Sequence, residues 1–218
     1  MAAPAPAVPA ATLVLVRDGP AGLEVLMLKR HENTVFSGAL VFPGGRLDPE
    51  DEADGLIARC RPVAGVDRAA LGYRVAAIRE CYEEAHLLLA RAAGEADLLT
   101  AAALDGLEAE TARQLGRPPR FRDLLGSGRI ELATDALVPF GRWVTPERSP
   151  KRYDTMFFLA RSPDGQVVRP DMRTKQNLAF KWRAFPVIGK PGRVLSDEQV
   201  VSVPHAQHLD PHQSRSDN

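Results

Sequence analysis

One helical segment, from Asp67 to about Arg91, constrains the fold of this chain more than any other stretch. At about 100° per residue, its apolar side chains fall within one narrow stripe. The stripe consists of Leu71, Val75, Ile78, Tyr82, Ala85 and Leu89. Such a stripe has to pack on a hydrophobic core, and Asp67 has the residue type of a helix N-cap. We therefore expect a long amphipathic helix.

The face opposite this stripe is acidic. Glu80 lies at about 180° from the stripe, with Glu83 and Glu84 about 60° and 40° to either side of it. Glu80 and Glu84 are one turn apart, so their side chains can converge, although like charges at this spacing destabilise a helix. Only Arg79 offers local compensation. Oxygen-rich clusters of this kind suit Mg²⁺, Mn²⁺ or Ca²⁺, and a solvated acidic surface is the alternative.

Strand patterns lie on both sides of this helix. Residues 12–30 predict two strands around a Gly/Pro turn at Asp18 to Gly22, and "GALVF" predicts a strand that ends at Pro43-Gly44-Gly45. Beyond the helix we expect one or two helices within 95–115, a short helix in 121–128, and strands at 138–145, 153–161 and 178–185. Strands and helices in this order predict an α/β fold with a mixed sheet.

The overall composition excludes several classes of protein. Lys plus Arg and Asp plus Glu number 28 each among 218 residues, and this lack of a basic surplus counts against tight binding of nucleic acid duplexes. No apolar run reaches the roughly 18 residues of a membrane span, and the start lacks the features of a secretory signal. Cys60 and Cys81 are too few for a disulfide framework and fit the reducing cytoplasm. Residues 1–10 and the polar tail 205–218 are expected to be disordered.

The glycine turn and the acidic helix together resemble the Nudix box, G-x5-E-x7-R-E-U-x-E-E-x-G-U, in which U is bulky and apolar. Gly45 stands at its start, Asp51 at its first acidic position, and "RECYEEAHL" fills residues 79–87. The later segment "RWVTPERSPKRYDTMFFLA" is similar to a motif of one Nudix branch, the peroxisomal and mitochondrial coenzyme A diphosphatases. The resemblance covers roughly residues 11–160. It implies a single domain over 11–204 with a Nudix-type α/β/α sandwich around a mixed β-sheet.

Three positions depart from the box. The gap between Asp51 and Arg79 holds 27 residues, 52 to 78, where the box has seven. That branch carries a similar insertion, and we expect residues 52–66 to loop out of the catalytic geometry. His86 replaces the box glycine, and because the apolar stripe runs on past it, we expect the helix to continue. Gln176 stands where relatives often carry a glutamate, and an amide is a weaker magnesium ligand than a carboxylate.

By this resemblance, the protein is expected to be an enzyme that hydrolyses a diphosphate bond with a divalent cation, Mg²⁺ or Mn²⁺. Glu80, Glu83 and Glu84 would hold the metal together with the carbonyl oxygen of Gly45. Glu80 would also serve as general base, and Glu83 would assist catalysis. Arg79 would pair with a neighbouring carboxylate and orient it.

Other candidate residues carry weaker signals. Arg30, Arg46 and Arg152 could meet substrate phosphates, with solvated surface as the alternative for each. Trp143 and Trp182 are expected in the core rather than stacked on a substrate. Cys81 lies beside the apolar stripe and is expected to be inert packing.

Three functions are compatible with the resemblance. Its branch implies coenzyme A or an acyl derivative as substrate, split into 3′,5′-ADP and 4′-phosphopantetheine products. ADP-ribose or nucleotide sugars are alternatives, and so is a Nudix-fold binding module without catalysis. The intact Arg79, Glu80, Glu83 and Glu84 set argues against the binding module. The expected partner is a small nucleotide derivative, with no nucleic acid and no membrane, and a homodimer is possible.

Overall fold

The structure is a computed structural model, and it describes residues 4–20, 22–29, 40–169 and 179–184. All of these fall within one compact unit, Met1–Phe185. The other unit, Pro186–Asn218, lies outside the described residues, and with it the domain end predicted at 204 and the polar tail. Two candidate site residues, Arg30 and Gln176, also lie outside the described residues.

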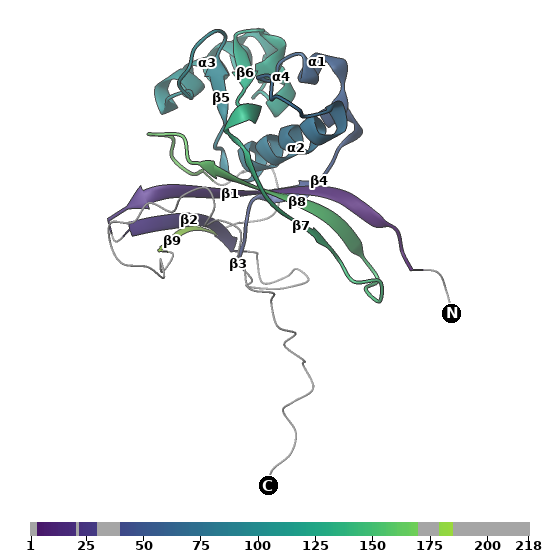
Figure 1. Cartoon of the computed structure of the whole chain (residues 1–218). Helices are drawn as coiled ribbons and strands as arrows, with labels where there is room; N and C mark the ends of the chain where they lie inside the picture. The colour runs from purple at the N-terminus through teal and green to yellow at the C-terminus, as the bar shows by residue number, and fades with distance from the viewer. Residues whose placement is uncertain (1–3, 21, 30–39, 170–178, 185–218) are drawn as a thin grey trace. The chain divides into compact units, whose positions relative to one another are not determined.

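A mixed sheet carries the fold (Figure 1). β1 (Ala7–Gly19) and β2 (Gly22–Lys29) form the expected antiparallel hairpin, with Gly19 paired to Gly22 at the turn. β8 (Arg152–Arg161) runs parallel to β1, and β7 (Val138–Val144) pairs antiparallel with β8. The remaining strands are β3 (Leu40–Val41) and β9 (Ala179–Ala184), which pair with β2, and β4 (Gly44–Arg46), which pairs with β1. The sheet order is β3-β2-β1-β8-β7, and the parallel β1–β8 pair makes the sheet mixed, as predicted.

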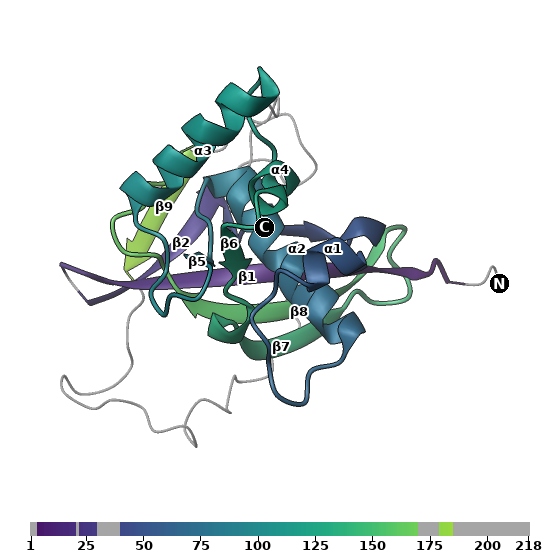
Figure 2. The ribbon, with the colours of Figure 1, turned by 90° about the horizontal axis from the view of Figure 1, so that it is seen from above.

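The described helices gather on one face of this sheet, as Figures 1 and 2 show. They are α1 (Asp54–Ile57), α2 (Arg68–Ala85), α3 (Ala101–Leu115) and α4 (Phe121–Gly126). Shorter elements lie among them: the 3₁₀ turns η1 (Pro49–Glu52) and η2 (Thr134–Ala136), and the paired strands β5 (Ala90–Ala92) and β6 (Ile130–Leu132). α2 packs directly on β1, and the main hydrophobic cluster fills the space between the sheet and the helices.

Helix α2 begins as predicted but is buried more widely than predicted. The Asp67 side chain accepts a hydrogen bond from the Ala70 amide at 2.8 Å, which is the geometry of an N-cap. Within the helix, the buried members of the predicted stripe are Val75, Ile78, Tyr82 and Ala85. Residues outside the stripe are fully buried as well, namely Ala76, Ala77 and Cys81. The reason is that β1 covers one side of α2 while η1, α1 and α4 contact others, so the apolar face is wider than one stripe.

The end of α2 differs from the sequence prediction. The helix stops at Ala85, and His86 forms its C-cap in the left-handed conformation with φ of 59°. The predicted continuation to about Arg91 is therefore wrong. Leu87, Leu88 and Leu89 are fully buried in extended chain that leads into β5. Spacing alone cannot distinguish such a short buried run from a further helical turn.

Two more expectations are corrected. β1 begins at Ala7 and pairs there with Arg152, so the last part of the predicted disordered lead-in 1–10 belongs to the sheet. Trp143 is 59% exposed on β7, so it is not a core residue. Trp182 is partly buried against the core, as expected, with the Arg17 guanidinium 4.0 Å from its ring centre.

In the part of the chain that the structure describes, no helix has both the length and the apolar character needed to span a membrane.

Candidate active site

Arg79, in the second half of α2, is the hub of the candidate site. Its Nε and Nη2 donate to the two carboxylate oxygens of Asp51 at 2.8 and 2.9 Å. Its Nη1 lies 2.7 Å from Glu80 Oε1 and 3.3 Å from Glu83 Oε2, and Nη2 also donates to the Arg46 carbonyl at 3.0 Å. The expected pairing of Arg79 with a neighbouring carboxylate is therefore present. Burial works to lower the pKa of Arg79, but the bonds to Asp51 and Glu80 outweigh it and raise the pKa above its usual value.

Asp51 reaches Arg79 because the sequence "DPED" folds into the 3₁₀ turn η1. Asp48 caps this turn through its side chain, which accepts from the Glu50 amide at 3.0 Å, and Pro49 occupies the first position. In return, Asp51 accepts from the Asp48 amide at 2.8 Å. This capping box directs the Asp51 carboxylate inward, where it is fully buried. The first acidic position of the box thus supports Arg79.

The glycine strand β4 lies directly against the carboxylates of α2. The Gly44 amide donates to Glu84 Oε2 at 3.0 Å. A Cβ placed on Gly45 would lie 2.5 Å from Glu80 Oε1, so only glycine permits this approach. Pairing of Gly45 with Ala11 on β1 holds the strand in place. The two ends of the box therefore meet in space, although 27 residues, 52 to 78, separate Asp51 from Arg79.

The charges of this cluster are unbalanced. Arg79 is the one cation in the hydrogen bonds described above, and it faces Asp51, Glu80 and Glu83. Burial raises the pKa of Glu83, and the Glu80 and Asp51 carboxylates add to this rise while Arg79 opposes it. An excess of carboxylate over cation suits a divalent ion with a preference for oxygen ligands.

The donor chemistry thus fits Mg²⁺ or Mn²⁺, but the side chains are not gathered around one point. Among the described residues, no group of three His, Cys, Asp or Glu side chains is placed as a metal-ligand set. Instead, Glu80 and Glu83 turn toward Arg79, and Glu84 turns toward the Gly44 amide. Binding of a metal would require these carboxylates to exchange hydrogen-bond partners.

The structure does not direct the side chains of Arg46 and Arg152, two residues predicted to contact substrate phosphates, into the carboxylate cluster. Arg46 contributes its carbonyl oxygen to Arg79, and its side chain is exposed. The Arg152 side chain donates to the carbonyl oxygens of Thr145 and Ala5 at 3.0 and 2.7 Å. Arg152 pairs with Ala7, four residues along β1 from the partner of Gly45, or roughly 13 Å at 3.3 Å per residue. The structure does not bring Arg152 to the carboxylates.

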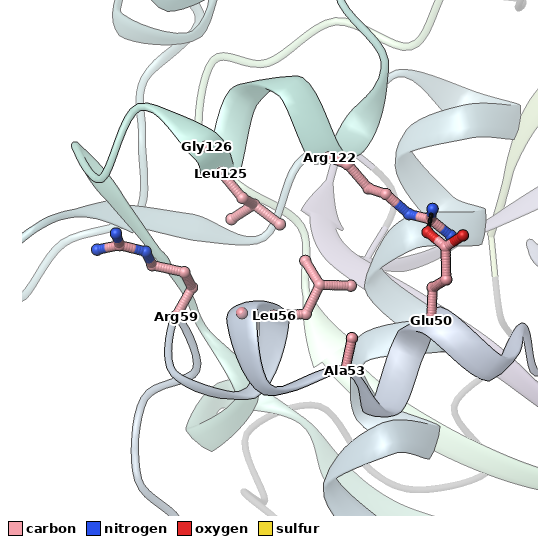
Figure 3. A pocket seen from close by; sticks show the side chains of 8 residues that line it. Glu50, Ala53, Leu56, Arg59, Arg122, Leu125 and Gly126 are labelled. Carbon is pink, nitrogen blue, oxygen red and sulfur yellow. Dashed lines mark ion pairs between the residues drawn. The ribbon is translucent and has the colours of Figure 1, made fainter.

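The insertion is ordered rather than a simple outward loop. Leu56 is buried in the core, and the backbone at Arg59 and Arg61 bonds to Leu132 of β6 at 2.7 and 2.9 Å. A pocket of about 350 Å³ lies between α1 and α4. Figure 3 shows Leu56 and Leu125 within it, flanked by Arg59 on one side and the ion pair of Arg122 with Glu50 on the other. The insertion therefore contributes to the fold beside the candidate site.

One residue of α3 that contacts the end of α2 was not predicted from the sequence. Glu108 of α3 accepts a hydrogen bond from Tyr82 Oη at 2.5 Å, and its other oxygen lies 3.2 Å from His86 Nε2. Tyr82 and His86 are one turn apart, which indicates a shared face, but no local pattern in the sequence points to Glu108.

Comparisons with known proteins agree with this geometry. No family model matches the chain. The Caenorhabditis elegans protein "Putative nudix hydrolase 7" is 27% identical over 161 residues, which cover 72% of this chain and 45% of that protein. The chain thus spans less than half the length of this curated relative. A NUDIX hydrolase from Alicyclobacillus acidocaldarius, known from a crystal structure, has 29% sequence identity to this chain. The two structures match with a TM-score of 0.60, over 81% of this chain and 78% of that one.

The fold is an α/β arrangement around a mixed sheet. In its candidate site, the glycine strand β4 lies against the part of α2 that carries Arg79 and the three glutamates. This arrangement agrees with the two similarities. The chain has the Nudix α/β fold, and its sequence is similar to those of Nudix hydrolases.

Proposed function

We propose that this protein is a metal-dependent diphosphatase. It hydrolyses a diphosphate bond in a nucleoside diphosphate that is linked to another moiety. The observation that carries the proposal is the assembled cluster, in which Arg79 bridges Asp51, Glu80 and Glu83 while Glu84 contacts the glycine strand. A chain that had kept only the fold would have no need for three acidic groups around one buried arginine.

The residues of the cluster have separate tasks in this proposal. Mg²⁺ or Mn²⁺, when bound, supplies charge neutralisation at the phosphate oxygens and a more acidic water. Glu80, Glu83, Glu84 and the Gly45 carbonyl oxygen would hold it. Glu80 is our candidate for the group that accepts a proton from the attacking water. Arg79, fixed by its two bonds to Asp51, limits the directions in which Glu80 and Glu83 can point.

Coenzyme A or an acyl derivative is the proposed substrate, with 3′,5′-ADP and 4′-phosphopantetheine as products. The support is the motif over residues 142–160, which resembles the coenzyme A diphosphatases. Cys60 and Cys81 are both free thiols, and we propose a reducing compartment, the cytoplasm, as the location.

A hydrolysis assay with purified protein, Mn²⁺ and coenzyme A tests both the proposed activity and the proposed substrate. We expect release of 3′,5′-ADP that stops in excess chelator. Hydrolysis of ADP-ribose or a nucleotide sugar in place of coenzyme A would reassign the substrate. Absence of hydrolysis with all three would indicate a binding module.

The variant Glu84→Gln tests whether the Glu84 carboxylate binds the metal. We expect a loss of metal affinity of at least about tenfold and loss of hydrolysis, with the fold intact. Glu110→Gln is the matched control, because Glu110 is only partly buried and contacts Arg113 and Gln114 within its own helix. Activity of the wild-type protein that persists in excess chelator would exclude the metal-dependent reaction.

A further inference from the structure

The C-terminal end of α2 has an unusual residue at its cap. His86 is the one residue other than glycine with a positive φ in the described part of the chain. The left-handed conformation is strained for a residue with a Cβ, which is why glycine usually ends helices in this way. Contacts made by the histidine side chain can compensate for this strain.

Those contacts converge on Glu108 of α3. One Glu108 oxygen accepts from Tyr82 Oη at 2.5 Å and the other lies 3.2 Å from His86 Nε2. Since an ionised carboxylate only accepts, Nε2 must carry a proton in this contact. The rings of Tyr82 and His86 stack with their centres 5.2 Å apart. Burial acts to raise the pKa of Glu108, but its bonds to His86 and Tyr82 outweigh burial and lower the pKa below the usual value.

A second set of contacts attaches the same helix end to α3. The Arg169 amide donates to the Ala85 carbonyl at 3.1 Å, which satisfies one of the free carbonyl groups at the end of α2. The Arg169 side chain then pairs with Asp105 of α3 at 3.0 Å. Asp105 lies one turn before Glu108, so both attachments use the same region of α3.

This attached end is the turn that carries two of the candidate metal ligands. Glu83 and Glu84 lie in the last turn of α2, and His86 follows Glu84 by two residues. The last turn of a helix frays when nothing holds it. A frayed turn would have to become ordered each time it bound a cation, and that ordering weakens binding.

We propose that Glu108 is a positioning residue for the metal-binding turn of α2. It acts through His86 and Tyr82, and it holds the turn from which Glu83 reaches Arg79 and Glu84 reaches the glycine strand. The role rests on the proposed function, because it assumes that this turn binds a divalent cation. In this chain, His86 ends α2 in the left-handed conformation at the position of the box glycine, and its contact with Glu108 tethers the helix end to α3.

The test measures Mn²⁺ binding without substrate, by electron paramagnetic resonance of the free ion, together with kcat for coenzyme A and the melting temperature. In Glu108→Gln, the negative charge is lost and only one oxygen remains to accept from His86 or Tyr82, and in His86→Gly the tether is lost while the backbone strain is relieved. We expect both to weaken Mn²⁺ binding about three- to tenfold. This is less than the loss of about 10–100-fold for groups that bond a metal ligand directly.

Two further variants separate positioning from stability. His86→Gln keeps an N–H donor of similar reach and should retain most of the Mn²⁺ affinity, whereas His86→Gly should lose it even if its melting temperature is unchanged. Glu110→Gln makes the same chemical change on α3 without contact to α2, and it should bind Mn²⁺ as the wild-type protein does.

Wild-type Mn²⁺ affinity in both Glu108→Gln and His86→Gly would overturn the proposal. Loss of the folded state in both would overturn it too, because the contact would then support the whole fold rather than the metal-binding turn. The proposed function fails separately: a wild-type protein that binds Mn²⁺ but hydrolyses no diphosphate refutes the activity and leaves the binding comparison valid.

Discussion

Replacement of Asp51 by asparagine tests the contact on which the candidate site depends most. Asp51 is fully buried and accepts three hydrogen bonds, from Arg79 Nε, Arg79 Nη2 and the Asp48 amide, at 2.8, 2.9 and 2.8 Å. Asparagine keeps the shape but loses the charge, and its NH₂ group then faces a donor. Breaking a buried ion pair by changing one partner costs about 3–5 kcal/mol. This is a large part of the roughly 5–15 kcal/mol by which a typical domain is stable.

Urea unfolding of the wild type and Asp51→Asn measures this loss. Asp154→Asn is the matched control, because Arg142 Nε and Nη2 bond the two oxygens of Asp154 in the same two-bond manner. The difference is exposure: the Arg142 side chain is 63% exposed and that of Arg79 is 9% exposed. Since exposed pairs contribute at most about 1 kcal/mol, the control should lose no more than that.

A double variant completes the experiment. Asp51→Asn combined with Arg79→Met should lose less stability than the two single losses added together, because neither partner is then left buried with its charge alone. Equal losses in Asp51→Asn and Asp154→Asn would refute the reasoning, and so would strict additivity of the two changes at the buried pair.

Three further predictions concern other parts of the chain. Gly45→Ala should reduce metal-dependent hydrolysis, because its Cβ would lie 2.5 Å from Glu80 Oε1; the rate should stay unchanged in Gly55→Ala, where an added Cβ meets nothing within 4 Å. Cys81 is fully buried, and burial raises its pKa, so alkylation at about pH 8 should require unfolding, and rapid labelling of the native protein would contradict this. The folded pKa of Glu108 lies below its ordinary value of 4.5, so its ionised form stabilises the protein above about pH 4.5 and this contribution is lost as the pH falls through the folded pKa. Melting curves of Glu108→Gln and wild type should therefore converge in acid, and a constant difference down to about pH 3 would count against the shift.

The sequence by itself determined the features that depend on local geometry. A helix advances by a fixed angle per residue, so the placement of Glu80, Glu83 and Glu84 on one face followed from their spacing. The cap at Asp67 and the turn at the β1–β2 hairpin depend on residues close together in the chain, and both are found where the patterns predict them. The box motif also identified Arg79 and Asp51 as members of one site, by resemblance to a family.

Only the tertiary structure decided where α2 ends and which residues hold its end. Glu108 lies 22 residues from His86, and their contact exists because α3 packs beside the end of α2. The spacing of Leu87, Leu88 and Leu89 is compatible with another helical turn, yet burial in extended chain satisfies the same side chains. The exposure of Trp143 likewise depends on its place on the outermost strand, β7, of the main sheet order. A contact between distant residues depends on how the whole chain packs. The pattern within one segment therefore does not show which distant residue its side chains will contact.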